Sequence, residues 1–458
     1  MSTTVLATWA AGLTWEKIPG HVRRATARHL LDGVGNAVAA RRHGVATAAW
    51  TVAHGLGGPP EARVLTGHSR ISAPAAALGT GVLVHALDFD DTHGTALVHA
   101  TAVVLPAAFA VGQQVSATGA QVLTAAAAGL EVACRLGAAA PYGFHARGVH
   151  ATGAVGPLAA ALTAGCLSGM APSSLMNALG IAGSAAGGLL EFLDTGSDTK
   201  TLHPGLAGMN GLTATRLAGA GASGPHSVLE GRRGLYAALT DRAPDMESVT
   251  ADLGERWEAD RIGIKPYPNC QLMHVALDAL TDAFEGRWPE PESVSQIEVQ
   301  LHPDGIPIVC GPRTGLAAPL SSYKAKFDLP WSLAALTYDR AVTVDTYTRA
   351  SIERSPLAKL ASRVVVRPAH SRRPAADAPG RVVVRLTDGS ELIGAADSSR
   401  GTAANPLTDD QLRDKFLHNC GHHEAAAELA NSILNLDQAD SLTPLLDGAE
   451  RVAGQERT

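Results

Sequence analysis

Carboxylates and imidazoles gather in one short segment, Ala86 to Ala100, with the sequence ALDFDDTHGTALVHA. Its polar residues are three aspartates, two histidines and a threonine: Asp88, Asp90, Asp91, His93, His99 and Thr92. Such a set can supply general acids and bases, or ligands for a metal ion. The HExxH spacing of zinc enzymes and the EF-hand spacing are both missing, which argues against a metal. A capped, solvent-exposed helix end would use the same residue types.

Two further segments place a histidine at the expected start of a helix. In RGVHATGAVG, His150 comes just before Thr152, which we expect to be the N-cap residue. In DTGSDTKTLHPGLAGMNG, Lys200 and His203 precede Pro204, a residue suited to the first helical turn. The free N–H groups and the positive dipole end of a helix start attract anions. Both segments could bind a carboxylate or phosphate, and a surface histidine and a solvated lysine are the plainer interpretations.

A fourth segment, Ile264 to His274, has the sequence IKPYPNCQLMH. Pro266 keeps the preceding Lys265 extended, so a stiff loop presents this lysine ahead of Cys270 and His274. The cysteine could be a nucleophile beside the histidine. A rigid linker with an incidental lysine and an inert cysteine is the alternative. The composition changes here, and interdomain clefts often hold ligand sites.

The elements that carry these segments are mostly helical. Apolar residues recur at spacings of three and four, and they predict helices over 22–40, 74–87, 106–115, 120–136, 156–167 and 173–182. Their interiors are rich in alanine and glycine, which allows close packing at some cost in backbone entropy. Gly205, Gly208 and Gly211 leave one helix face bare, so a neighbour must pack close to it.

A different pattern begins after about residue 268. Runs rich in β-branched residues predict strands at 295–301, 363–366 and 381–386, and Asp388-Gly389 predicts a hairpin turn before 391–393. A helix-capping signal follows at Thr408. We therefore predict a mainly α fold. A large all-helical domain is built from residues 1–268 and 400–458, and a smaller α+β lid domain is inserted at 269–399.

Composition excludes several classes of function. Of the 458 residues 46% are hydrophobic and 17% charged, as in globular proteins. The net charge of −6 and the lack of a basic stripe predict no nucleic-acid or membrane partner. Five scattered cysteines without a CxxC pair predict no disulfide framework. The first twenty residues lack a signal-peptide pattern and no apolar run is long enough to span a membrane, so we expect a cytoplasmic protein.

Taken in order, the four segments resemble the MmgE/PrpD family. The motifs are LDFDDTH, a His-x-Thr-Gly helix start, K-x-L-H-P-G and K-P-Y-P-x-C-x-x-x-H, and the similarity continues through AKFDLPW to LTDDQLRDKF near the end. The family includes 2-methylcitrate dehydratase, cis-aconitate decarboxylase and iminodisuccinate epimerase. The resemblance implies a helical domain with an inserted lid, a homodimer, and an active site between the domains that uses no metal and no cofactor.

At positions that match the family motifs, the resemblance implies roles for individual residues. The catalytic positions are Asp88, His99, His150, Lys200 and Lys265, and the substrate-binding positions are Thr92, His203, Cys270, His274 and Trp331. The two lysines would hold substrate carboxylates, and His99 and His150 would exchange protons. Asp88 would orient a histidine or lysine, and Thr92 would donate a hydrogen bond to a substrate oxygen.

These roles leave the reaction open. The substrate would be a small anionic di- or tricarboxylate, and we expect a metal-independent carbon–oxygen lyase of the 2-methylcitrate dehydratase type. An epimerase of an iminodisuccinate-type dicarboxylate would use the same proton abstraction. Cys270 and Trp331 stand where the decarboxylase-like branch has a histidine and a tyrosine, which argues against cis-aconitate decarboxylation. A dimer that only binds a small acid is the non-catalytic alternative.

Overall fold

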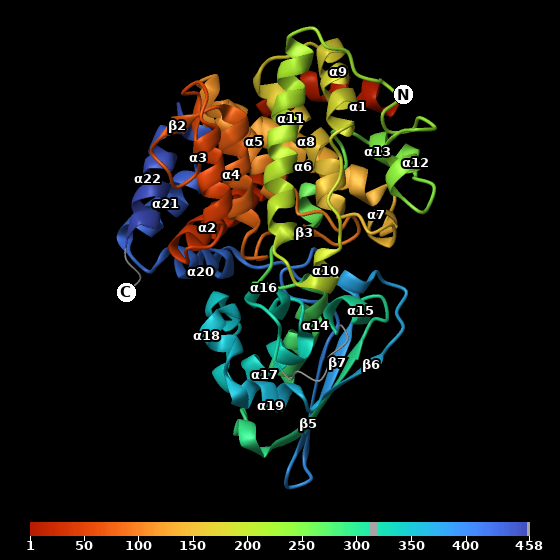
Figure 1. Ribbon diagram of the computed structural model, residues 1–458, viewed down its shortest axis with the longest axis vertical. Helices are drawn as coiled ribbons and strands as arrows, with labels where there is room; N and C mark the ends of the chain where they lie inside the picture. The colour runs from red at the N-terminus through yellow and green to blue at the C-terminus, as the bar shows by residue number, and fades with distance from the viewer. Residues whose placement is uncertain (311–317, 456–458) are drawn as a thin grey trace. The chain divides into compact units, whose positions relative to one another are not determined.

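The computed structural model describes residues 1–310 and 318–455 as two compact units (Figure 1). Unit 1 comprises Met1–Leu190, Thr199–Ile264 and the described part of Thr408–Thr458. Unit 2 comprises Glu191–Asp198 and Lys265–Leu407. Helix accounts for 57% and strand for 9%, which confirms the predicted mainly α composition with a small sheet.

Unit 1 is a bundle of helices with two very short strand pairs. The helices of its N-terminal part are α1 Ser2–Ala11, α2 Gly20–Arg42, α3 Thr47–Leu56, α4 Ala73–His85, α5 Ala100–Gln114, α6 Gly119–Ala138, α7 Gly143–Ala146, α8 Ala151–Leu167 and α9 Pro172–Gly183. They are followed by α11 His203–Gly219, α12 Leu235–Leu239, α13 Met246–Thr250, and then α20 Asp409–Cys420, α21 Glu424–Leu434 and α22 Thr443–Gly454. Strand β1 Ala62–Arg63 pairs with β2 Arg70–Ile71, and β3 Thr92–His93 pairs with β4 Ile262–Gly263, both antiparallel.

Glycine lets α11 pack against α4 and α8 at very short range. A Cβ atom at Gly205 would lie 2.4 Å from the main-chain oxygen of Leu78 on α4. A Cβ atom at Gly211 would lie 2.5 Å from the Cβ of Ala160 on α8. The predicted close approach is therefore confirmed at these two positions. Gly208 differs, because its Cβ would make only an ordinary contact, at 3.6 Å.

Two helices begin earlier than the prolines suggested. The predicted helix starts near Pro106 and at Gly156 were wrong. Helix α5 begins at Ala100 and α8 at Ala151, and Pro106 and Pro157 lie inside these helices. An interior proline removes one backbone hydrogen bond, and the surrounding packing compensates because both helices are almost completely buried. As a result, His99 and His150 are the N-cap residues of α5 and α8.

Unit 2 is organised around a four-stranded mixed sheet in the order β6-β5-β7-β8. Strand β5 (Val294–Leu301) pairs in parallel with β6 (Val364–Pro368) and antiparallel with β7 (Gly380–Leu386), which forms a hairpin with β8 (Glu391–Ala396). The hairpin turn contains Gly389 at φ +86°, as the Asp-Gly signal predicted. Its helices are α10 Phe192–Thr195, α14 His274–Ala283, α15 Ile306–Val309, α16 Ser322–Ala325, α17 Leu329–Asp339, α18 Arg349–Ile352 and α19 Ser355–Ala361. Helix α14 packs against β7 and β8.

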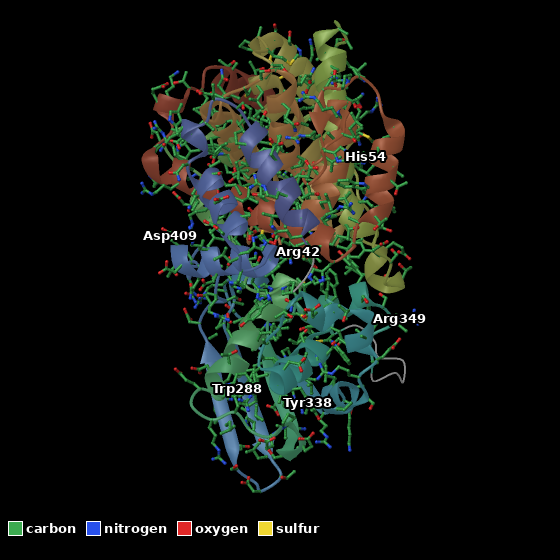
Figure 2. All side chains as sticks on the ribbon, turned by 90° about the vertical axis from the view of Figure 1, so that its left-hand side faces the viewer. Arg42, His54, Trp288, Tyr338, Arg349 and Asp409 are labelled. Carbon is green, nitrogen blue, oxygen red and sulfur yellow. The ribbon has the colours of Figure 1, made fainter. Side chains whose placement is uncertain are left out.

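The C-terminal part of the chain completes unit 1. Helix α20 begins at Asp409, which is labelled in Figure 2, and packs against α2. Thr408 and Gln411 exchange the two hydrogen bonds of a capping box, as predicted. All five cysteines are free thiols. Among the described residues, no helix combines the length and the apolar character that a membrane crossing requires.

Candidate functional site

The aspartate-rich segment forms a buried loop between α4 and α5. Asp88, Asp90 and Asp91 are all 0% exposed, which rules out the alternative of a solvated helix end. The backbone of Asp88 has φ +53°, in the left-handed region that residues other than glycine seldom adopt. Such a conformation persists where the surrounding structure fixes the chain, and it is frequent at functional sites.

Two of these aspartates pair with groups on other segments of unit 1. The Oδ1 atom of Asp88 lies 2.9 Å from the Nζ of Lys200, which is on the short 3-10 turn η2 (Thr199–Leu202) before α11. Both carboxylate oxygens of Asp90 lie within 2.9 Å of the Nδ1 of His85, the last residue of α4. These contacts hold the loop against the ends of two helices.

The third aspartate of the loop, Asp91, pairs with His29 of α2. The Nδ1 of His29 lies 2.9 Å from Asp91 Oδ2, and its Nε2 lies 3.0 Å from the main-chain oxygen of Ala259. Both ring nitrogens therefore face acceptors, as in an imidazolium. Burial acts to lower the pKa of His29, but the carboxylate of Asp91 outweighs it and the pKa is raised.

The position of the His99 proton follows from its neighbours. Its Nδ1 lies 2.9 Å from the main-chain oxygen of Asp91 and 3.1 Å from Thr92 Oγ1. A carbonyl oxygen only accepts, so Nδ1 carries the proton and a neutral His99 holds its lone pair on Nε2. The backbone N–H of His99 donates to Thr152 Oγ1 at 3.0 Å. Thr152 was wrongly expected to cap α8; it lies inside that helix and anchors His99 instead.

His150 and His203 form a directly bonded pair of imidazoles. Their Nδ1 atoms are 3.1 Å apart, so one donates and the other accepts. Burial, reinforced by the charge of Lys200, lowers the pKa of His150 well below its usual range. Burial, followed by His85 and Lys200, lowers the pKa of His203 to about 4. Both rings are therefore neutral near pH 7 and able to accept a proton.

Five imidazole rings meet in what we call the histidine cluster: His85, His99, His145, His150 and His203. The ring centroid of His150 lies 5.6 Å from that of His99, 6.0 Å from His145 and 5.3 Å from His203, and the centroids of His85 and His99 are 4.6 Å apart. Burial lowers the pKa of His145 to about 4. The sequence reasoning missed His85 and His145. The sequence could have indicated both histidines by their closeness to predicted site residues, because His85 precedes Asp88 by three residues and His145 precedes His150 by five.

Distance alone would admit a cation beside the loop. One ligand atom each from His85, Asp88, Asp90 and His99 lies within 4.8 Å of the others. The ammonium group of Lys200 already supplies positive charge at Asp88, and the N–H of His85 faces both oxygens of Asp90. Because these donors take up the carboxylates, we assign no metal to this set.

The other predicted residues belong to unit 2. Lys265 is buried, at 2% exposure, and Trp331 is fully buried in α17. The backbone N–H of Cys270 donates to the Lys326 oxygen. Nε2 of His274 lies 3.3 Å from the main-chain oxygen of Asn269. This contact engages one of the two ring nitrogens that could activate the thiol of Cys270. Unit 1 therefore gathers Asp88, Thr92, His99, His150, Lys200 and His203, and the roles of the unit 2 residues stay predictions.

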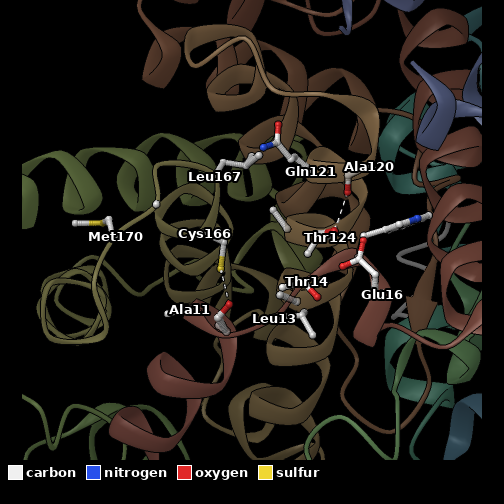
Figure 3. Close-up of a pocket in the computed structure, with 15 residues that line it drawn as sticks. Ala11, Leu13, Thr14, Glu16, Ala120, Gln121, Thr124, Cys166, Leu167 and Met170 are labelled. Atoms are coloured by element: carbon white, nitrogen blue, oxygen red, sulfur yellow. Dashed lines mark hydrogen bonds between the residues drawn. The ribbon is translucent and has the colours of Figure 1, made fainter. Parts of the chain in front are cut away.

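A separate cavity of about 470 Å³ lies among α1, the 3-10 turn η1 (Trp15–Lys17), α6 and α8 (Figure 3). Most of its lining is small or apolar, and Glu16 and Cys166 contribute the ionisable groups. Burial raises the pKa of Cys166 to about 12, which keeps the thiol protonated and unreactive. A cavity with a carboxylate and no cation in its lining does not suit an anionic substrate.

The fold and the loop define a mainly helical protein in which five imidazole rings lie close together beside a buried aspartate loop. Two family models match it, the MmgE/PrpD N-terminal domain over residues 4–247 and the MmgE/PrpD C-terminal domain over residues 267–438. The chain belongs to the MmgE/PrpD family, as its motifs indicated.

Several relatives match along most of their length. A cis-aconitate decarboxylase of Aspergillus terreus is 28% identical over 479 residues, which cover 97% of this chain and 95% of that protein. The Homo sapiens cis-aconitate decarboxylase is 26% identical, over 83% of this chain and 80% of that protein. The Mus musculus protein of the same name is also 26% identical, with 83% and 79% covered.

Proposed function

We propose that this chain is a lyase that acts on a small di- or tricarboxylate, and specifically a hydro-lyase of the 2-methylcitrate dehydratase type. The observation that carries the proposal is the histidine cluster beside the Lys200–Asp88 pair in unit 1, which is buried except for the half-buried His145. Dehydration needs one group that takes a proton from a carbon next to a carboxylate and another that gives a proton to the departing hydroxyl. Neutral imidazoles supply such a base, and two bonded imidazoles can pass a proton between them.

The residue roles follow from the proton positions. Nε2 of His99 holds a lone pair and takes the C–H proton, while Nδ1 keeps its bond to the Asp91 oxygen. The electrons of the broken C–H bond form the double bond. The hydroxyl leaves as water with a proton that the His150–His203 pair, neutral in the free protein, takes up when the substrate binds. Lys200 attracts a substrate carboxylate, and Asp88 fixes the position of the ammonium group.

A cis-aconitate decarboxylase is the second candidate, and the names of the relatives favour it. In that reaction a C–C bond breaks, carbon dioxide leaves, and the carbon must receive a proton. Both reactions need a proton donor, so the neutral state of the paired imidazoles near pH 7 does not favour one over the other. The cysteine at position 270, where the decarboxylase-like branch has a histidine, is the feature that favours dehydration, and it does so through the resemblance.

The test is incubation of the purified full-length protein with 2-methylcitrate, citrate, cis-aconitate and iminodisuccinate. We expect an unsaturated acid, seen by absorbance, from 2-methylcitrate or citrate without release of carbon dioxide. Carbon dioxide from cis-aconitate would establish the second candidate, and a change in chirality without either product would establish an epimerase. Saturable binding without turnover would contradict a lyase.

The variant that tests the site is His150→Gln, which should lose activity. The control is His54→Gln, which alters a partly buried histidine at the end of α3 (Figure 2). Full activity of His150→Gln would show that the site is assigned wrongly. The homodimer implied by the resemblance is a further proposal, which light scattering of the purified protein tests.

A further inference from the structure

Among its described residues, unit 1 contains three buried pairs in which a histidine nitrogen lies within 3.0 Å of a carboxylate oxygen. They are His29 with Asp91 at 2.9 Å, His85 with Asp90 at 2.8 Å, and His93 with Glu258 at 3.0 Å. All three histidines are less than 4% exposed, so their environments are comparable. The pairs differ in what the second ring nitrogen contacts.

Two of the pairs use both nitrogens of the ring. The second nitrogen of His29 lies 3.0 Å from the Ala259 oxygen, and Nδ1 of His93 accepts the backbone N–H of Ala96 at 3.1 Å. Nε2 of His85 is buried and has no hydrogen-bond partner within residues 1–310 and 318–455. A buried polar atom left without a partner costs about 1–3 kcal/mol, so it calls for a reason.

The position of the His85 proton is fixed by Asp90. Both oxygens of this carboxylate lie within 2.9 Å of Nδ1 of His85, so Nδ1 carries the proton and Nε2 keeps the lone pair. The ring centroid lies 4.6 Å from that of His99 and 6.1 Å from that of His150. The available lone pair is thus inside the histidine cluster.

Asp90 also stabilises a positive charge on the His85 ring more than on the His99 ring. A carboxylate bonded to one nitrogen stabilises the imidazolium that forms when the other accepts a proton. Nδ1 of His99 instead contacts the uncharged Asp91 carbonyl and Thr92 hydroxyl, and lies 3.7 Å from Asp90 Oδ2. A proton taken by His99 would therefore gain stability by moving to His85.

We propose that His85 is a proton-relay residue of this site, and that Asp90 is its positioning residue. The proposal rests on the function proposed above and deepens it. His99 takes the substrate proton on Nε2, and the proton moves to Nε2 of His85 once the two rings come within hydrogen-bond distance, which restores the lone pair of His99 for the next turnover. Only N–H bonds form and break in this step. His85 later returns the proton through the cluster to the imidazole that protonated the leaving hydroxyl.

The ionisable groups around His85 come from several elements and will shape any pH profile. They are Asp88 and Asp90 in the loop, His99 at α5, His145 at α7, His150 at α8, Lys200 on η2 and His203 at α11. The test therefore compares profiles between variants that keep these groups. The variants are His85→Gln and Asp90→Asn, and the matched control is His93→Gln, from a pair whose ring nitrogens are both bonded.

We expect His85→Gln to lower kcat by about 10- to 100-fold, below the full effect of a general base, with little change in KM, and to remove one ionisation from the kcat profile. Asp90→Asn should lower kcat and displace that same ionisation. His93→Gln should lower the melting temperature and leave the shape of the profile unchanged. Equal profiles for His85→Gln and His93→Gln would overturn the relay.

A second measurement does not depend on turnover. In the wild-type protein labelled with 15N-histidine, His85 should appear as the Nδ1–H tautomer and gain a proton on Nε2 as the pH is lowered; the His85→Gln spectrum assigns the signal. An Nε2–H tautomer would overturn the proposal even if the enzyme is a lyase. The expected tautomer with no turnover on any of the acids would instead contradict the proposed function.

Discussion

The pair of Lys200 and Asp88 allows the sharpest test of the site. Their side chains are 7% and 0% exposed, and the ion-pair distance is 2.9 Å. Lys200→Met keeps much of the side-chain volume and leaves the Asp88 carboxylate buried without its cation. Removal of one partner from a buried pair costs about 3–5 kcal/mol. In a chain of 458 residues, 1 kcal/mol shifts the melting temperature by about 1–2 °C, so it should fall by roughly 3–10 °C.

The double variant Lys200→Met/Asp88→Asn separates stability from function. Replacing a buried ion pair by neutral groups is often close to neutral for stability, so the double variant should regain most of the lost melting temperature. Activity should stay lost, because the ammonium group that attracts the substrate is missing. In both variants the pKa of His203 should rise from about 4, since the positive charge of Lys200 contributes to lowering it.

Differential scanning calorimetry and NMR titration of the histidine ring protons measure both effects on the same samples. The reasoning is refuted if Lys200→Met melts at the wild-type temperature, or if the double variant is no more stable than the single one. Either result would mean that the pair carries no buried charge. An unchanged His203 titration would show that Lys200 is not close enough to act on the cluster.

Three further predictions concern packing, pH and helix α20. Gly205→Ala should strongly lower the melting temperature, because its Cβ would lie 2.4 Å from a backbone oxygen, whereas Gly208→Ala, at 3.6 Å from its neighbour, should be tolerated. Acidification from about pH 6.5 to 4 should lower the melting temperature, since the three histidines with lowered pKa, His145, His150 and His203, stay neutral when folded while the unfolded chain binds their protons. The raised pKa values of the buried carboxyl groups of Asp32, about 6, and Glu131 oppose this, and calorimetry across this range measures the sum. Lys415→Met should lower both the melting temperature and kcat, because Lys415 Nζ bonds the main-chain oxygen of Phe89 in the aspartate loop at 2.8 Å; an unchanged kcat in a steady-state assay would contradict a role in positioning that loop.

Local sequence signals were sufficient for much of the fold. The Asp388-Gly389 turn and the capping box at Thr408 involve neighbours in the chain, and both were confirmed. The early starts of α5 and α8 could not be predicted in this way, because the cost of Pro106 and Pro157 is offset by burial against other helices. The spacing of apolar residues indicates the secondary structure that a segment favours by itself, whereas these helix starts depend on contacts between segments.

The site shows the same division. The aspartates and His99 stood out because they are crowded into one segment. Their partners did not, since His29 and Lys415 lie on α2 and α20 and carry no local motif. His85 was missed, because it lies inside the predicted helix 74–87 rather than in the aspartate-rich segment. Only the fold shows that its ring is buried beside Asp90 and inside the histidine cluster.

An acidic loop in a site proposed for anionic substrates would repel its own ligand unless its charge were offset. Each carboxylate of the loop faces a donor from a different helical segment: Lys200 for Asp88, His85 for Asp90 and His29 for Asp91. These contacts also hold the strained backbone at Asp88, whose φ of +53° the loop would not adopt alone. The donors therefore set the charge of the site and the shape of the loop together. Loss of any one of them should weaken anion binding and folding at once, which distinguishes this arrangement from a surface cluster whose charges act separately.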